Sequence, residues 1–133
     1  MALFTDLEIF KTTLKLVTLC TKYVATMDKN YRGTIGADMR RDCREVIQRI
    51  QLANSRSGKE RIEQIEALRW AVGQIEVAVR ICVDPEVRAL SPTHQARLIP
   101  LTVSIGKQAT GWKQQTENAL ARQVATVARP MRY

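Results

Sequence analysis

Basic side chains are the residues of this 133-residue sequence that most clearly suggest chemistry, because they are unevenly distributed. The chain carries 21 lysines and arginines against 13 aspartates and glutamates, a net charge of +8. Residues 1–86 hold 14 basic and 12 acidic side chains, whereas residues 87–133 hold 7 basic and 1 acidic. Such a concentration favours polyanions, either nucleic acid or an anionic membrane surface. An ordinary solvated basic face is the alternative interpretation.

Two groups of these cations are candidate binding surfaces. The first lies on one face of an expected helix and comprises Lys11, Lys15 and Lys22. The second lies toward the C-terminus and comprises Lys107, Lys113, Arg122, Arg129 and Arg132. Only 5% of the residues are aromatic, so few rings are available to stack on bases. The sequence therefore favours contact with a phosphate backbone over reading of unpaired bases.

The sequence lacks the residue combinations that catalysis or metal binding would require. His94 is the only histidine, whereas a di-metal helical bundle needs a Glu-x-x-His motif on each of two helices. Asp38 and Asp42 could pair on one helical face, but neighbouring arginines favour a salt-bridged surface there. We expect no catalytic residue, no metal and no cofactor. Without a CxxC motif, buried free thiols in a reducing compartment are expected at Cys20, Cys43 and Cys82.

Amphipathic helices are expected to position these side chains, since apolar residues recur every three or four positions and do not alternate as in strands. The predicted helices span about 6–27, 31–53 and 59–83, and a fourth begins at Ser91-Pro92. Pro100 should kink this fourth helix or delay its start. The short connections predict an all-α, up-down-up-down antiparallel four-helix bundle in residues 1–115. Residues 116–133 are expected to form a basic tail that either extends the last helix or is disordered.

Individual positions carry more specific expectations. Thr5 and Glu8 have the spacing of a capping box. Gly33 and Gly36 either weaken the first turns of the second helix or allow close backbone contact there. Gly106 and Gly111 suggest a close approach of two helices. Both tryptophans, Trp70 and Trp112, are expected to be packing residues. The apolar stripe expected to face the core from the first helix is Leu7, Phe10, Leu14, Val17 and Val24.

The helix expected over 59–83 becomes apolar on most sides toward its end, where Val77, Ala78, Ile81 and Val83 join the core stripe. A narrow polar seam remains at Arg69, Gly73, Glu76 and Arg80. One small bundle cannot cover such a helix, so self-association is expected. No signal peptide and no membrane-spanning apolar run is recognisable, which predicts a cytoplasmic protein without a membrane partner.

Short motifs occur in a recognisable order along the chain. They are Asp6-Leu7-Glu8-Ile9-Phe10, Arg32 with Ile35-Gly36 and Arg40, Leu68-Arg69, Arg80, Leu90-Ser91, Ile105-Gly106-Lys107 and Gly111-Trp112-Lys113. In order and spacing they resemble the accessory variability determinant family of diversity-generating retroelements, over about residues 6–113. The chain departs from that family at Met27-Asp28-Lys29, where members often carry Phe-Pro-Lys, and at Thr110-Gly111, where they often have two glycines.

The resemblance implies four-helix protomers assembled into a pentameric, basic, barrel-like ring. It implies binding to the retroelement's reverse transcriptase and to nucleic acid, especially template RNA, in support of mutagenic copying into cDNA. Arg80 and Lys107 are its best binding candidates, whereas Arg32 and Arg40 either bind or form structural salt bridges. The complete set of expected nucleic-acid or partner contacts is Arg80, Lys107, Arg69, Lys113, Arg32, Arg40, Arg44, Lys11 and Lys15.

Two alternatives to this functional interpretation stay open. The first is the related bundle family encoded within ribosomal RNA intervening sequences, whose members also form rings. The second is a ring that binds only protein partners. Fold likeness alone does not separate these functions.

Overall fold

The computed structural model describes residues 3–128, and every regular element in that range is a helix. A short 3₁₀ helix, η1, is followed by four long α-helices and one helical turn. Their bounds are η1 Phe4–Asp6, α1 Glu8–Ala25, α2 Lys29–Arg32, α3 Ile35–Ser55, α4 Gly58–Val83 and α5 Pro92–Ala128. The all-α prediction is confirmed. None of the helices in this range has the length and apolar character needed to cross a bilayer.

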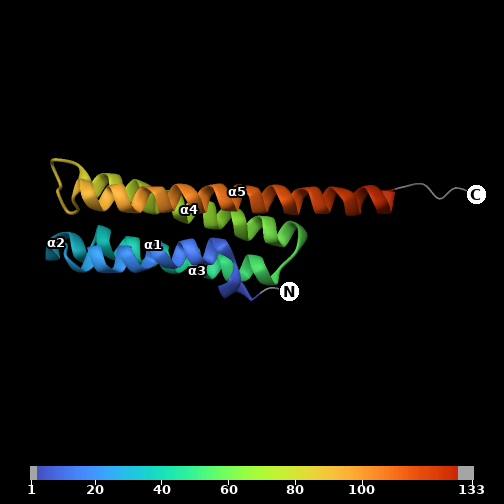
Figure 1. The fold of residues 1–133 in the computed structure, drawn as a ribbon, viewed down its shortest axis with the longest axis horizontal. Coiled ribbons are helices and arrows are strands. Elements are labelled where there is room, and N and C mark those ends of the chain that lie inside the picture. Colours follow the sequence, from blue (N-terminus) through green and yellow to red (C-terminus); the bar gives the residue numbers. More distant parts are fainter. Residues whose placement is uncertain (1–2, 129–133) are drawn as a thin grey trace, which may run out of the picture.

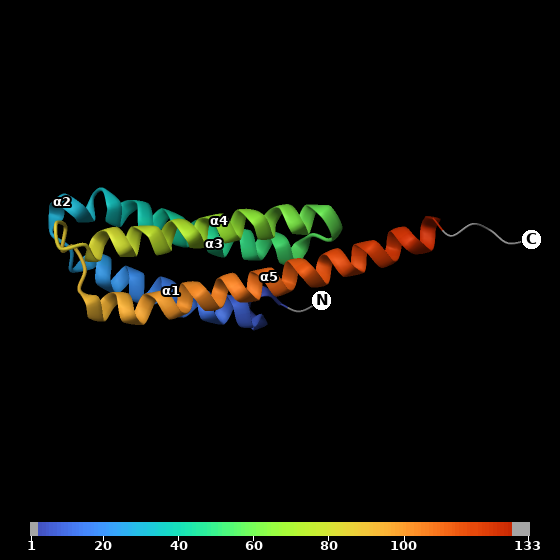
Figure 2. The ribbon, with the colours of Figure 1, turned by 90° about the horizontal axis from the view of Figure 1, so that it is seen from above.

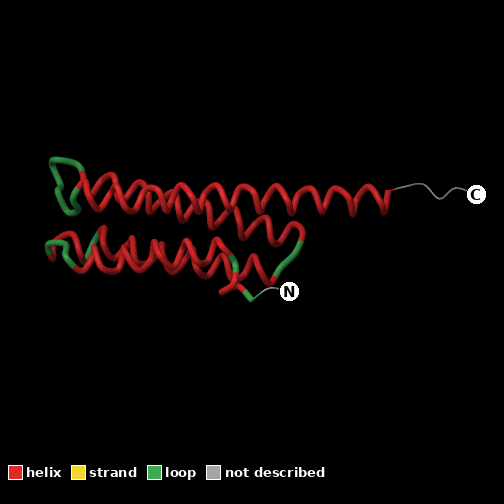
Figure 3. Tube along the Cα trace, in the orientation of Figure 1, coloured by secondary structure: helices red, strands yellow, loops and turns green. Residues whose placement is uncertain are grey.

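The four long helices lie lengthwise beside one another (Figures 1 and 2). α3 packs against α1 and α4, and α5 also packs against α1 and α4, so the four helices surround a common core. The connections between α1 and α3 and between α4 and α5 lie at one end, and the α3–α4 turn lies at the other (Figure 1). Loops are confined to these ends, and α5 continues past the α3–α4 turn as uninterrupted helix (Figure 3).

The core stripe of α4 follows the sequence pattern. Its buried residues at alternating steps of three and four are Ile65, Leu68, Val72, Ile75, Val79 and Cys82. Burial of an aliphatic side chain of this size contributes about 1.5–3 kcal/mol, so this stripe is a major part of the bundle's stability. All three cysteines are buried free thiols, as expected.

On α1 the buried stripe lies beside the predicted one. The buried residues are Ile9, Thr13, Leu16, Cys20, Tyr23 and Val24. Leu14 is 50% exposed, so its assignment to the core is wrong. α1 carries two adjacent stripes with the same spacing, and Thr13 can join the buried one because its hydroxyl donates to the Ile9 carbonyl at 2.7 Å.

The helix ends correct two further predictions. The Thr5–Glu8 capping box does not form: Leu7 is the N-cap of α1, without a side-chain cap hydrogen bond. The expected helix over 31–53 is divided into α2 and α3. The Asp28 carboxylate caps α2 by accepting from the Asn30 amide at 2.9 Å. Gly36 then allows α3 to approach α1, since an added Cβ would lie 2.8 Å from Val24 Cγ1.

α5 begins at Pro92, as predicted, but Pro100 does not delay it. Pro100 lacks the amide hydrogen that would bond to the Ala96 carbonyl. Both residues are exposed, so that carbonyl is on the side of the helix open to water. Residues 116–128 extend α5, which is the helical form of the predicted tail. Arg129 and Arg132, two of the expected cations, lie outside the described residues.

Candidate nucleic-acid interface

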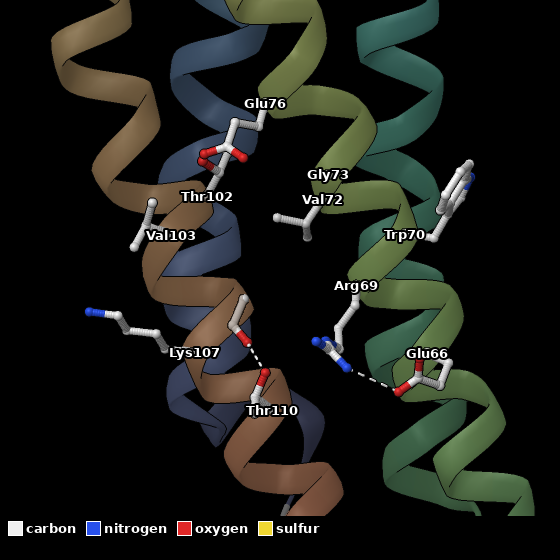
Figure 4. Close-up of a pocket in the computed structure, with 11 residues that line it drawn as sticks. Glu66, Arg69, Trp70, Val72, Gly73, Glu76, Thr102, Val103, Lys107 and Thr110 are labelled. Atoms are coloured by element: carbon white, nitrogen blue, oxygen red, sulfur yellow. Dashed lines mark hydrogen bonds and ion pairs between the residues drawn. The ribbon is translucent and has the colours of Figure 1, made fainter.

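A groove of about 650 Å³ runs along the outside of the bundle between α4 and α5 (Figure 4). Its α4 wall contains Arg69, Gly73 and Glu76, three residues of the polar seam expected from the sequence. Its α5 wall contains Val103, Gly106, Lys107 and Thr110. The helical repeat therefore gathers residues from two parts of the chain, about 35 positions apart, on one surface.

Two glycines keep this groove open. A Cβ added to Gly73 on α4 or to Gly106 on α5 would meet no atom within 4 Å. The prediction that Gly106 and Gly111 mark a close approach of helices is therefore wrong, since Gly111 also faces open space. Glycine serves both to let helices touch and to leave backbone accessible, and the sequence does not separate these uses.

The surface around the groove carries more positive than negative charge once Arg80 and Lys113, which flank the lining residues, are included. Glu66 accepts from Lys113 Nζ at 2.8 Å and from Arg69 Nη1 at 3.1 Å. The hydrogen bond from Lys113 and the nearby Arg69 lower the pKa of Glu66, against a smaller opposing effect of burial. Glu66 thus stays ionised between two cations. Its single negative charge balances only one of their two positive charges.

The rest of this surface has one ion pair and one unpaired cation. Arg80 Nη2 lies 3.7 Å from Glu76 Oε1, one helical turn away on α4. Lys107 is exposed, and no carboxylate of residues 3–128 pairs with it. The four cations of this face exceed its two carboxylates, which leaves a net positive surface.

The structure brings together four of the nine predicted contact residues. Arg69 and Lys107 line the groove, Lys113 is held by Glu66 at its edge, and Arg80 follows Glu76. We name these four cations the α4–α5 basic face. Lys113 also serves the fold, because its bond to Glu66 joins α5 to α4.

The remaining five predicted residues lie on other helices and do not line this groove. They are Lys11 and Lys15 on α1, Arg32 on α2, and Arg40 and Arg44 on α3. Lys11 pairs with Glu8 at 3.4 Å. Among the described residues, Arg32 and Arg40 form no ion pair, so the salt-bridge alternative for them has no partner in that range. The pairing expected on α3 occurs instead at Arg41–Asp38 (3.2 Å) and Arg49–Glu45 (2.7 Å).

Trp70 is a surface residue, contrary to the prediction from the sequence. It was expected in the core, but it is 72% exposed on the outside of α4, on the side turned away from α5 (Figure 4). Its register could have revealed this, because Trp70 lies midway between the core positions Leu68 and Val72. Trp112 does pack against the core, with the Arg61 guanidinium carbon 5.7 Å from its ring centroid.

His94 has a structural role at the start of α5. Its Nδ1 accepts from the Ser91 amide at 3.2 Å, and its own amide donates to Ser91 Oγ at 3.2 Å. The ring stacks on Tyr23 with centroids 4.0 Å apart. Partial burial and the positive charge of Arg97 lower the pKa of His94. The imidazole is therefore held neutral as a reciprocal cap.

No cluster in the described part of the chain offers three His, Cys, Asp or Glu side chains to a metal ion. The Cys20 thiol is not activated as a nucleophile, because its hydrogen bond with Cys43 and its burial raise its pKa. Burial likewise raises the pKa of Cys82 to about 11.

The sequence and structure were also compared with known proteins. No protein-family model, no curated protein and no solved structure matches this chain.

Proposed function

We propose that this protein is a non-catalytic adaptor that binds nucleic acid through the α4–α5 basic face. The observation that carries the proposal is the unpaired Lys107 in the groove, together with Arg69, Arg80 and Lys113, which outnumber their two carboxylate partners. Phosphates that displace counterions from such a face gain affinity with little dependence on base sequence.

The partner proposed for the adaptor is the reverse transcriptase of a diversity-generating retroelement. The nucleic acid would be that element's template RNA and cDNA, and the role would be support of mutagenic copying in the cytoplasm. The ordered motifs from Asp6 to Lys113 support this part of the proposal. They include Arg80 and Lys107, both of which belong to the α4–α5 basic face.

The adaptor is proposed to act as a homo-oligomer, a pentameric ring of up-down-up-down bundles. Two apolar side chains near the end of α4 support self-association, because Val77 is 52% exposed and Ile81 is 47% exposed in the single chain. Neither lines the α4–α5 groove, so a sister copy could cover them and leave the basic face accessible.

Charge reversal tests the binding surface. We expect Arg80→Glu combined with Lys107→Glu to weaken RNA binding and reverse transcriptase binding while circular dichroism shows an intact bundle. The slope of log K against log salt should fall by roughly 0.7 per lost phosphate contact on single strands. Lys59→Glu is the matched control, since Lys59 is an exposed cation of the same helix outside the groove. Unchanged RNA binding at low salt would remove Arg80 and Lys107 from the site.

A ring that binds only protein partners is the second candidate, and the exposed Val77 and Ile81 favour it. A salt titration separates the two functions. Affinity for RNA must fall steeply with salt if phosphates are bound, whereas a protein-only ring would show no RNA binding even at low salt.

A further inference from the structure

Trp70 stands apart from the other exposed apolar residues of α4 because it borders the α4–α5 groove. Val77 and Ile81 lie further along the helix and do not line that groove. A tryptophan that is 72% exposed leaves most of its ring uncovered in the single chain. An aromatic ring beside a cationic groove is the combination by which proteins hold single-stranded nucleic acid.

The charges around Trp70 differ between its two sides. On the α3 side, a smaller groove is lined by Arg41, Asp42, Glu45 and Arg49. Both arginines there are already paired, Arg41 with Asp38 and Arg49 with Glu45. On the α5 side, Arg69 shares Glu66 with Lys113, and Lys107 has no carboxylate partner among the described residues. A polyanion is therefore attracted to the α5 side of Trp70.

Gly73 opens a path between the groove and Trp70. It lies three residues after Trp70, and an added Cβ would meet no atom within 4 Å. Trp70 is directed away from α5 (Figure 4), so a strand bound in the groove must cross α4 to reach the ring, and Gly73 presents no side chain of its own at that crossing. The phosphates of the strand then lie near Arg69 and Lys107, while one base reaches the ring of Trp70.

We propose that Trp70 is a stacking platform for an unpaired base of a single-stranded nucleic acid whose phosphates lie against Arg69 and Lys107. This inference rests on the proposed nucleic-acid binding and makes it more specific. A duplex keeps its bases stacked inside the helix, so it can use the phosphate contacts but not the ring. The site consequently selects single strands over duplexes. This selectivity comes from the ring, because the phosphate contacts are available to both.

Fluorescence of Trp70 gives a direct test. Trp112→Phe leaves Trp70 as the only tryptophan and keeps an aromatic ring in the packed position of Trp112. A single-stranded RNA of about 12 nucleotides, within the site sizes of known single-strand binders, should quench this fluorescence on binding. A duplex of the same sequence should bind without comparable quenching.

Substitution at Trp70 gives an independent measurement in the otherwise unchanged chain. Trp70→Ala should weaken the Kd for single-stranded RNA roughly 5- to 150-fold, the range for loss of one base–aromatic stack. Trp70→Phe should retain most of the affinity, and the Kd for duplex should change little in both variants. Trp70→Leu, which keeps apolar area without a flat ring, should behave like Trp70→Ala.

Three results would overturn the inference. Equal affinity for single strand and duplex, without quenching, would leave the proposed function standing but exclude stacking. A change of oligomeric state in Trp70→Ala, seen by sedimentation, would show that a sister copy covers the ring. Absence of binding to both RNAs at low salt would instead contradict the proposed function itself.

Discussion

Gly36 occupies a position where a single carbon atom decides how closely α1 and α3 pack. A Cβ there would lie 2.8 Å from Val24 Cγ1, 3.1 Å from Met27 Sδ and 3.2 Å from the Tyr31 carbonyl. We expect Gly36→Ala to lower the free energy of unfolding by about 1–3 kcal/mol, because the backbone carbonyl cannot move aside cheaply. Urea denaturation measures this change.

Gly111 supplies the matched control for Gly36. It lies within α5, is exposed, and faces no atom within 4 Å of an added Cβ. Gly111→Ala should raise the free energy of unfolding by up to about 1 kcal/mol, because glycine weakens a helix interior. The same loss of stability at both positions would contradict the packing role of Gly36.

His94 makes part of the stability depend on pH. Its Nδ1 accepts from the Ser91 amide and must be unprotonated to do so. The folded pKa is lower than the ordinary value of 6.5, so the unfolded chain binds the proton more readily. The contribution of neutral His94 to the free energy of unfolding is therefore complete above pH 6.5. It is lost as the pH falls through the lowered pKa of His94 in the folded chain.

His94→Gln isolates this contribution, since glutamine accepts the same capping hydrogen bond without titrating. Unfolding by urea should show a smaller fall in stability between pH 7 and pH 5 for His94→Gln than for the unchanged chain. An identical fall in both proteins would assign the pH dependence to other groups.

At the residue scale, the sequence predicted charges better than contacts. Helical spacing could place Arg69 and Arg80 on one side of α4, whereas Arg80 and Lys107 were singled out as contacts by the family resemblance. Trp70 was assigned to packing from its residue type, although its register beside Leu68 places it outside the core. The pairing of Lys113 with Glu66 depends on how α4 and α5 are aligned, which the pattern within one helix does not determine.

At the scale of the helices, Pro100 is the residue whose replacement is expected to stabilise α5. α5 continues through it, although its ring removes one hydrogen bond of the helix. Pro100→Ala should restore that bond to the Ala96 carbonyl and raise stability by up to about 3 kcal/mol. Thermal unfolding followed by circular dichroism should show a higher Tm. An unchanged or lower Tm would mean that the proline ring contributes packing that alanine cannot replace.

Among the elements, α4 was predicted almost to its ends, whereas the predicted stripe of α1 is correct at Val24, only partly buried at Leu7, Phe10 and Val17, and wrong at Leu14. The core stripe of α4 is continuous, and turn residues before Gly58 and Asp84-Pro85 after Val83 delimit the helix. α1 offers two equally spaced apolar stripes, so the choice between Leu14 and Leu16 depends on how the neighbouring helices pack. The length of α5 was left open because the apolar pattern weakens after Trp112.

At the scale of the whole molecule, the uncovered end of α4 predicts self-association. We expect the unchanged protein to sediment as an oligomer and Val77→Asp combined with Ile81→Asp to sediment as a single chain with its helix content retained. Both side chains are about half exposed, so the bundle itself should tolerate the change. Val124→Asp is the control, because Val124 is 60% exposed and lies on another helix, α5. Unchanged sedimentation of the double variant would exclude this patch as the contact.

The projection of α5 beyond the α3–α4 turn makes the two ends of the molecule unequal (Figure 2). One end carries the loop between α4 and α5, which contains Arg88, and the other carries a single helical arm that ends at Ala128. Copies related by a rotation axis parallel to the helices would all direct this arm the same way, forming a crown on one side only. A protein that recognises the crown would then dock on one side of the assembly, and geometry would limit how many copies of it each assembly can hold.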